Sequence, residues 1–227
     1  MGMLNKTTIL LYLVRALVML VAIPFHEAAH AWVSYKLGDN TAKEAGRLSL
    51  NPMAHFDLLG ALCMVFVGVG WAKPVPTNPR RFKNPKLGMA LSASAGPIAN
   101  ILLAFVSMLL YKVIYYFTPD TVAWGFVLFF LLNMTRLNIM LAVFNLLPVP
   151  PLDGSRLMTV FLPQRTYFKI MQYEQYIMMG MFLLLIAGVL DTPLAFLNNV
   201  LWNFMMWSTS FVDKLFLTAM HSITVLA

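Results

Sequence analysis

The chain has 227 residues, of which 60% are hydrophobic and only 11% charged, and its mean hydropathy is +0.75. A soluble domain cannot bury that much apolar surface, so the composition excludes an ordinary globular protein and indicates an integral membrane protein. The single cysteine excludes a disulfide framework, and the net charge of +7 lies in short segments between apolar runs, which argues against nucleic-acid binding.

Apolar stretches along the chain predict the membrane helices. A span needs roughly 20 residues, and five stretches are long enough, at residues 4–35, 87–117, 122–147, 173–190 and 194–217. A further stretch at residues 58–71 has about 14 residues, a length that suits a re-entrant or interfacial segment. The sequence therefore predicts an all-α polytopic membrane protein. We expect a single domain over residues 1–227, with five to six transmembrane helices and a short re-entrant or strand-like segment after the first.

Basic residues between these stretches give the orientation. The loop at residues 71–86 carries five lysines or arginines and no acid, and residues 156–169 carry three more basic residues. The connections at residues 118–120 and 191–193 carry no lysine or arginine. By the positive-inside rule, we expect both basic loops to be cytoplasmic and both other connections to be external.

The first apolar stretch ends in a motif that carries chemistry, HEAAH at residues 26–30. His26 and His30 are four residues apart, so on a helix both imidazoles lie on one face and can reach one metal ion. Glu27 lies beside them, and this pattern is typical of zinc metalloproteases, with two nitrogen ligands and a general base. Ionisable groups are costly in an apolar helix, which favours a functional role over the alternative of a hydrogen-bonded polar cluster.

Catalytic zinc usually has three protein ligands, so two histidines leave the site incomplete. Asp153 is the candidate third ligand, because it follows a proline-rich break, and irregular backbone at membrane depth is tolerated where it lines a cavity. Its alternative role is a helix cap near the interface. If residues 58–71 only dip into the membrane, the stretch at residues 122–147 returns to the side on which His26 and His30 lie.

Several segments resemble one known family. HEAAH, SAGPIANILLA at residues 94–104 and FNLLPVPPLDGSRL at residues 144–157 resemble the site-2 protease family of intramembrane zinc metalloproteases. GRLSLNPMAHFDLLG and GWAKPVPTNP, at residues 46–60 and 70–79, resemble its compact prokaryotic branch, which has no PDZ or CBS domain. The resemblance covers about residues 26–157 and is weak from Tyr173 onward, where only the apolar character matches. We expect a catalytic core at about residues 4–157, followed by C-terminal helices at about residues 172–220.

The resemblance also implies roles for individual residues. One catalytic Zn²⁺ would be held by His26, His30 and Asp153, and Glu27 would be the base. Asn145 would lie near the substrate backbone, with Pro151 in the same loop.

Two asparagines are candidate substrate contacts in their own right. The amide of Asn145 offers a donor and an acceptor, which could hold an extended substrate strand or a developing oxyanion, or could make a helix–helix hydrogen bond. Small residues around Gly96 allow a neighbouring helix to approach, so Asn100 could point at the site or serve packing. His55 and Asp57 could lie near the catalytic rim, but we favour a solvated loop pair.

These observations predict an enzyme that hydrolyses peptide bonds in transmembrane segments, with a water activated at zinc by Glu27. The expected partners are a membrane-anchored protein or peptide substrate and the lipid bilayer. We expect a multi-pass protein of a prokaryotic cell membrane, with the active site toward the cytoplasm. Whether copies form a homo-oligomer stays open.

Two alternatives use the same ligands without proteolysis. The first is a membrane metal transporter or metal-binding protein, although transporters commonly contain paired repeats, and we find none in this sequence. The second is a silent scaffold that keeps the metal for stability.

Overall fold

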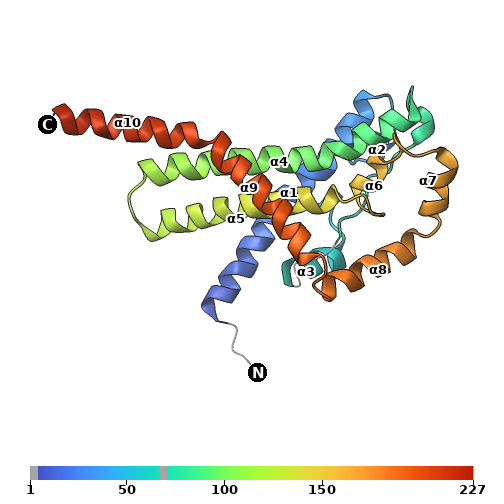
Figure 1. The fold of residues 1–227 in the computed structure, drawn as a ribbon, viewed down its shortest axis with the longest axis horizontal. Coiled ribbons are helices and arrows are strands. Elements are labelled where there is room, and N and C mark those ends of the chain that lie inside the picture. The colour runs from blue at the N-terminus through green and yellow to red at the C-terminus, as the bar shows by residue number, and fades with distance from the viewer. Residues whose placement is uncertain (1–4, 67–70, 227) are drawn as a thin grey trace.

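The computed structural model of the chain describes residues 5–66 and 71–226. Three long helices form its centre, namely α1 (Lys6–Lys36), α4 (Pro85–Phe117) and α5 (Val122–Asn145) (Figure 1). Each is long and apolar enough to cross a membrane. Because α4 packs along both α1 and α5, it is the central helix of the three.

Local sequence signals set the ends of α4 and α5. Asn84 caps α4 by accepting a hydrogen bond from the Leu87 amide, and Pro85 occupies the first turn, where its missing N–H costs nothing. Thr121 caps α5 through the Trp124 amide. Because α5 ends at Asn145, the proline-rich residues 146–152 form an irregular turn at its end.

Two apolar clusters hold the long helices together. One joins α1 to α5 and contains Val14, Val18, Ala22 and Met134. The other joins α4 and α5 to α9 (Asp191–Ser208) and contains Ala104, Met108, Ile139, Val143 and Met205. The C-terminal part of the chain is therefore packed against the central hairpin rather than separate from it.

The segment between α1 and α4 consists of short helices. These are α2 (Thr41–Glu44), the 3₁₀ turn η1 (Pro52–Ala54), α3 (Leu58–Phe66) and the 3₁₀ turn η2 (Pro79–Arg81). At 1.5 Å per residue α3 is about 14 Å long, which is too short to cross a bilayer. Residues 67–70 of the predicted re-entrant stretch lie outside the described residues. The described part of the chain contains no β-strand, so a strand-like segment is not found there.

The prediction of five to six transmembrane helices is wrong. Beyond α6 (Asp153–Leu157) and α7 (Gln164–Met171), the chain forms α8 (Glu174–Ile186), α9 and α10 (Ser210–Leu226). With 13 residues α8 is shorter than a span, and it ends at Ile186, two residues before Gly188, whose φ of 72° favours glycine. An 85° bend follows, so α8 and α9–α10 count together as at most one broken span. The described residues thus hold three candidate spans, or four with that pair.

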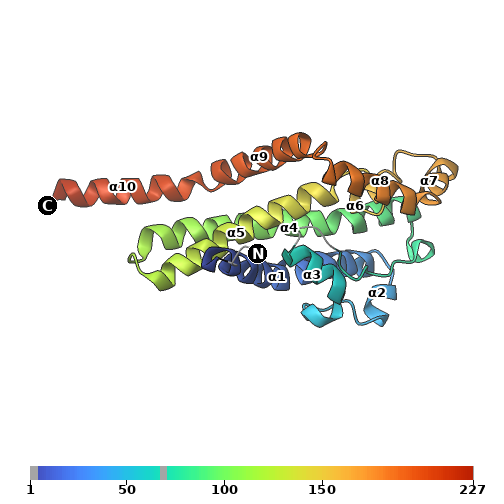
Figure 2. The same ribbon diagram turned by 90° about the horizontal axis from the view of Figure 1, so that it is seen from below.

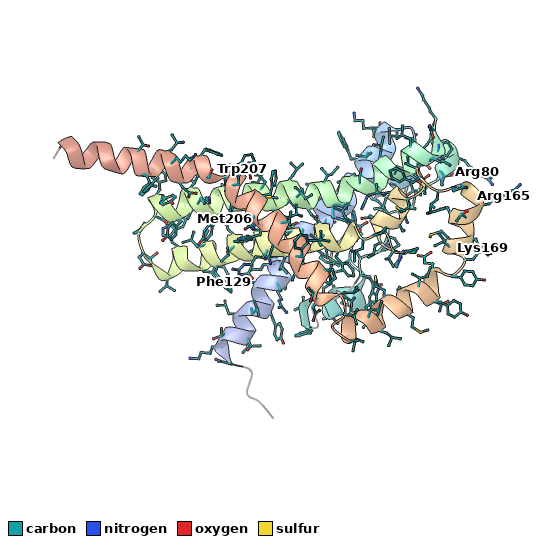
Figure 3. All side chains as sticks on the ribbon, in the orientation of Figure 1. Arg80, Phe129, Arg165, Lys169, Met206 and Trp207 are labelled. Carbon is teal, nitrogen blue, oxygen red and sulfur yellow. The ribbon has the colours of Figure 1, made fainter. Side chains whose placement is uncertain are left out.

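The elements are arranged in layers around the central hairpin. Figure 2 shows α9 and α10 on one side of α4 and α5, and α1 with α2 and α3 on the other. Arg80, Arg165 and Lys169 gather at the end of the molecule that carries α7, away from Trp207 (Figure 3). The two basic loops of the sequence therefore meet at one end of the helical core.

Candidate metal centre

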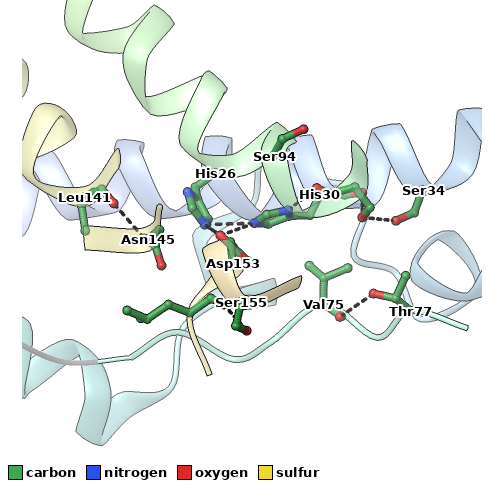
Figure 4. A network of polar contacts seen from close by, with 12 residues as sticks. His26, His30, Ser34, Val75, Thr77, Ser94, Leu141, Asn145, Asp153 and Ser155 are labelled. Atoms are coloured by element: carbon green, nitrogen blue, oxygen red, sulfur yellow. Dashed lines mark hydrogen bonds and ion pairs between the residues drawn. The ribbon is translucent and has the colours of Figure 1, made fainter. Parts of the chain in front are cut away.

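Two helices bring the three predicted ligands together. His26 and His30 lie on α1, and Asp153 is the first residue of α6, just after the proline-rich turn (Figure 4). Oδ2 of Asp153 lies 3.1 Å from Nε2 of His26 and 3.1 Å from Nε2 of His30, and the two Nε2 atoms are 3.0 Å apart. Three donor atoms thus converge on one point, although Asp153 lies more than a hundred positions after the two histidines in the sequence.

The spacing of these atoms suits a zinc ion. In a tetrahedral site with bonds of about 2.0–2.1 Å, ligand atoms lie about 3.3 Å apart, which is close to the separations found here. Two imidazoles and a carboxylate also form a typical catalytic donor set that leaves a fourth position free. His26, His30 and Asp153 could therefore hold a metal ion.

A neighbouring helix orients one of the imidazoles. His30 Nδ1 lies 2.7 Å from the backbone carbonyl of Ser92 on α4, to which it can donate its proton. Donation through Nδ1 leaves the Nε2 lone pair free for a metal, a common second contact of metal-bound histidine. One turn further along α1, the Ser34 hydroxyl lies 2.7 Å from the Ser92 hydroxyl, which fixes the two helices at this level.

The Asp153 carboxyl is held in its ionised form. Burial alone would raise its pKa, but the two imidazoles that face it, His30 first, hold this pKa well below the usual range. An ionised carboxylate is the form that binds a cation.

Gly96 of α4 lies directly against both imidazoles. A Cβ at this position would be 2.3 Å from Nε2 of His30 and 2.6 Å from Nε2 of His26. Real Cβ contacts are never that short, so only glycine fits here. The small residues noted around Gly96 in the sequence therefore serve the close approach of α4 to the metal-ligand cluster.

The cluster opens into a cavity of about 530 Å³. Glu27 lines this cavity and is buried, as are the ligand histidines. Asn100 also lines it and is fully buried, and its amide has no hydrogen-bond partner within the described residues. Asn145 lines the cavity too, with Nδ2 donating to the Leu141 carbonyl of its own helix at 3.0 Å, and Pro151 forms part of the wall.

An extended segment at residues 71–78, called the strap below, forms another wall of the cavity through Pro74, Val75 and Thr77. It is fastened at both ends. The buried guanidinium of Arg47 donates to the carbonyls of Lys73 and Pro74, and also to that of Ala54. At the other end the Asn78 amide donates to Oδ2 of Asp39 at 2.6 Å.

The strap also contacts His55. His55 is fully buried, its carbonyl accepts from the Lys73 amide at 2.8 Å, and its Nε2 lies 2.7 Å from the Ser49 carbonyl. The favoured interpretation of His55 as part of a solvated loop pair is therefore wrong. Asp57 instead caps α3, since its Oδ1 accepts from the Gly60 amide at 2.9 Å.

The sequence did not point to Arg47. Burial lowers the pKa of its guanidinium, and the negative charge of Glu27 raises this pKa again in part. Arg47 and Glu27 therefore interact electrostatically. A lone arginine in a loop carries no local signal of burial. Its three carbonyl partners lie 7 to 27 residues away, beyond the reach of a sequence pattern.

In this helical membrane protein, the H-E-x-x-H motif of the first span lies beside a carboxylate that is distant in the sequence. These are the features of a membrane metalloprotease. The family model of peptidase family M50 matches residues 112–188. A protein of Bacillus subtilis named "Putative zinc metalloprotease YwhC" is 40% identical over 208 residues, which cover 90% of each chain. The present chain therefore belongs to this family of site-2 type zinc metalloproteases.

More distant relatives carry the same description. Rip2 of Mycobacterium tuberculosis is 27% identical over 201 residues, covering 82% of this chain and 70% of its own length. Rip2 of Mycolicibacterium smegmatis is 26% identical over 190 residues with the same coverage. No solved structure matches the chain.

Proposed function

We propose that this metalloprotease cuts peptide bonds within the transmembrane segments of membrane-anchored substrates, using one zinc ion held by His26, His30 and Asp153. The proposal rests on the convergence of these three donor atoms near the C-terminal end of α1. Six residues of α1, about 9 Å of helix, separate His30 from the helix end, which supports a site on the spanning helix rather than in the loop beyond it.

The cavity suits an unwound peptide rather than an intact helix. A helical backbone hides its carbonyls in its own hydrogen bonds, so the substrate must open locally before attack. The strap offers an extended backbone beside the ligands, and an opened substrate strand could pair with it. Asn100 and Asn145 offer amide groups to the same peptide, and Pro151 forms part of the cavity wall.

Zinc at this site would polarise the substrate carbonyl and lower the pKa of water. Glu27 takes a proton from the attacking water and passes it to the nitrogen of the leaving amine as the C–N bond breaks. Asn100 is well suited to donate to the developing oxyanion, because its buried amide has no partner among the described groups.

The carboxylate of Glu27 is the sharpest test of this mechanism. Glu27→Gln keeps the shape of the residue but removes the base, so we expect zinc content to be unchanged and cleavage to fall by about 10²–10⁴-fold. Cleavage of a model transmembrane peptide in proteoliposomes and metal analysis measure the two quantities. Glu44→Gln, on an exposed carboxylate paired with Arg81, is the matched control and should cleave normally. Normal cleavage by Glu27→Gln would reject the mechanism.

We further propose that the active site faces the cytoplasm of a prokaryotic cell, because the basic loops gather at the end of the molecule near α7. Single cysteines in a Cys63→Ser background test this orientation. We expect Asp120→Cys to react with an impermeant maleimide in intact cells, and Lys83→Cys to react only after permeabilisation. The reverse pattern would place the site on the outer side.

A further inference from the structure

Arg136 is an arginine in the middle of a membrane-spanning helix, and the proteolytic mechanism does not use it. It is the only charged residue of α5. Counted along the axis, it lies about 21 Å from the start of α5 and about 14 Å from its end at Asn145. That end lies beside the metal centre, since Asn145 lines the same cavity as the ligands, and α1 continues beyond the ligands from His30 to Lys36. Arg136 is thus deep within a hydrocarbon layer of about 30 Å.

Arg136 is exposed on the outside of the helical core. Its guanidinium lies over the ring of Trp202 on α9, 5.4 Å from the ring centroid. Asn199 lies three residues before Trp202 on the same face of α9 and is also exposed. A cation and an aromatic ring therefore meet at the seam between α5 and α9, and an exposed amide lies one turn earlier on the same face of α9.

No acidic side chain among the described residues neutralises this charge. All nine acidic side chains lie in the described part of the chain, and none of them forms an ion pair with Arg136. The contrast with Lys112 is informative, because this buried lysine of α4 is paired with Asp213 at 2.6 Å. An unpaired charge in lipid is costly, and such groups usually mark a functional contact.

We infer that Arg136, Trp202 and Asn199 form a docking site for a transmembrane helix of another protein that carries an acidic side chain at mid-membrane depth. Charge complementarity selects an anion, and the depth selects a membrane-embedded partner, since lipid phosphates lie at the bilayer surface. A carboxylate can accept two parallel hydrogen bonds from one guanidinium.

A second copy of this chain does not fit the site. Of the three acids within or beside the spans, Glu27 is buried in the cavity, Asp153 lies in the metal centre and Asp213 is paired with Lys112. The other six lie in connections or at helix ends, and these are Asp39, Glu44, Asp57, Asp120, Glu174 and Asp191. The partner is therefore a different chain, such as a substrate or an accessory subunit.

Model peptides test the site without using proteolysis. The probe is a Leu/Ala transmembrane peptide with one central Glu, compared with the same peptide carrying Gln, in phosphatidylcholine vesicles. Energy transfer from the peptide to an acceptor on the protein measures association. We expect the Glu peptide to bind the wild-type protein about tenfold more tightly than the Gln peptide, as for polar contacts between model membrane helices.

Two variants assign the effect to Arg136. In Arg136→Gln the preference for Glu should disappear, while Arg15→Gln should retain it. Arg15 is the matched control because α1, on which it lies, is on the side of the hairpin opposite α9 (Figure 2). Equal binding of both peptides by the wild type, or a preference that survives in Arg136→Gln, would overturn the inference.

A depth scan covers the case in which Arg136→Gln does not fold. Moving the Glu of the peptide two turns toward either end should abolish the preference of the wild-type protein, and an unchanged preference would refute a mid-membrane contact. Adding phosphatidylglycerol to the vesicles distinguishes lipid from protein. Loss of the Glu preference there would assign Arg136 to lipid phosphate and overturn the docking site.

Discussion

At the residue scale, one missing side chain lets α4 reach the imidazoles of α1. Gly96 has no Cβ, and the backbone at this position therefore touches Nε2 of both His26 and His30. The same contact explains why the Ser92 carbonyl, one turn earlier on α4, can accept the proton of His30 Nδ1. The position of the metal centre is thus set as much by α4, which supplies no ligand, as by α1.

Gly96→Ala should consequently disrupt the metal centre. The added methyl group would lie within 2.6 Å of both imidazoles, so one ring or the whole of α4 must move. We expect zinc affinity to fall by at least about tenfold, in line with changes around metal ligands, with helical content preserved. Metal analysis and circular dichroism measure the two effects. Gly125→Ala is the matched control, because a Cβ there meets no atom within 4 Å. Equal zinc content in both variants would contradict this explanation.

The ligand residues themselves could be predicted from the sequence, but the neighbouring residues that hold them in position could not. The spacing of His26 and His30 follows from helical periodicity, and the proline-rich break before Asp153 marks an irregular turn. The contacts of Gly96, Ser92 and Arg47 join residues that are far apart in the sequence. Periodicity and motif spacing carry no information on the partners in such contacts, so these contacts were identified only from the structure.

At the element scale, the strap is held in an extended form by groups outside it. Arg47 binds the carbonyls at one end and Asp39 the amide at the other, while Val75 in the middle packs against Ala31 of α1. These contacts hold the backbone beside the cavity without a partner strand. An extended segment fixed in this way is preorganised for pairing with a substrate peptide.

Arg47→Met should therefore affect substrate binding more than zinc binding. Removing the guanidinium leaves three carbonyls without their donor and releases the strap at that end. We expect a higher KM for a model transmembrane peptide, with zinc content retained. Arg81→Met removes an arginine that is 41% exposed and serves as control. An unchanged KM, or loss of zinc together with activity, would show that Arg47 does not act through the strap.

The C-terminal elements show where hydropathy is a poor guide. Residues 173–190 and 194–217 are apolar enough to predict two spans, and composition contains no sign of the 85° bend between α8 and α9. The bend depends on Gly188 and on a helix of only 13 residues, whose Met178, Met181 and Phe182 line the cavity. The apolar character of α8 thus serves the cavity as well as the membrane.

At the scale of the whole molecule, a buried ion pair fastens the C-terminal helices to the core. Lys112 of α4 donates to Asp213 of α10 at 2.6 Å, and the Tyr116 hydroxyl donates to the other carboxylate oxygen at 2.9 Å. Lys112 is 5% exposed. This contact lies toward the end of α4 opposite the metal centre, so α9 and α10 are attached along the length of the hairpin.

Asp213→Ala should be destabilising, because it leaves the Lys112 charge buried without its carboxylate and with only the Met206 carbonyl as acceptor. Breaking a buried pair costs about 3–5 kcal/mol, whereas replacing both charges with apolar groups is often neutral. We expect a clearly lowered thermal unfolding temperature in detergent for Asp213→Ala, and near wild-type stability for the double variant Lys112→Met/Asp213→Leu. If the double variant is as unstable as the single one, the pair does not account for the attachment.

The donor atoms of the metal centre come from residues 26, 30 and 153, which has a consequence during synthesis. A growing chain carries both histidines into the membrane long before the ribosome has added the aspartate. Until then it has only two of the three ligands. The complete site can therefore form only after the third long helix has been made, so any ability to cut arises late in synthesis.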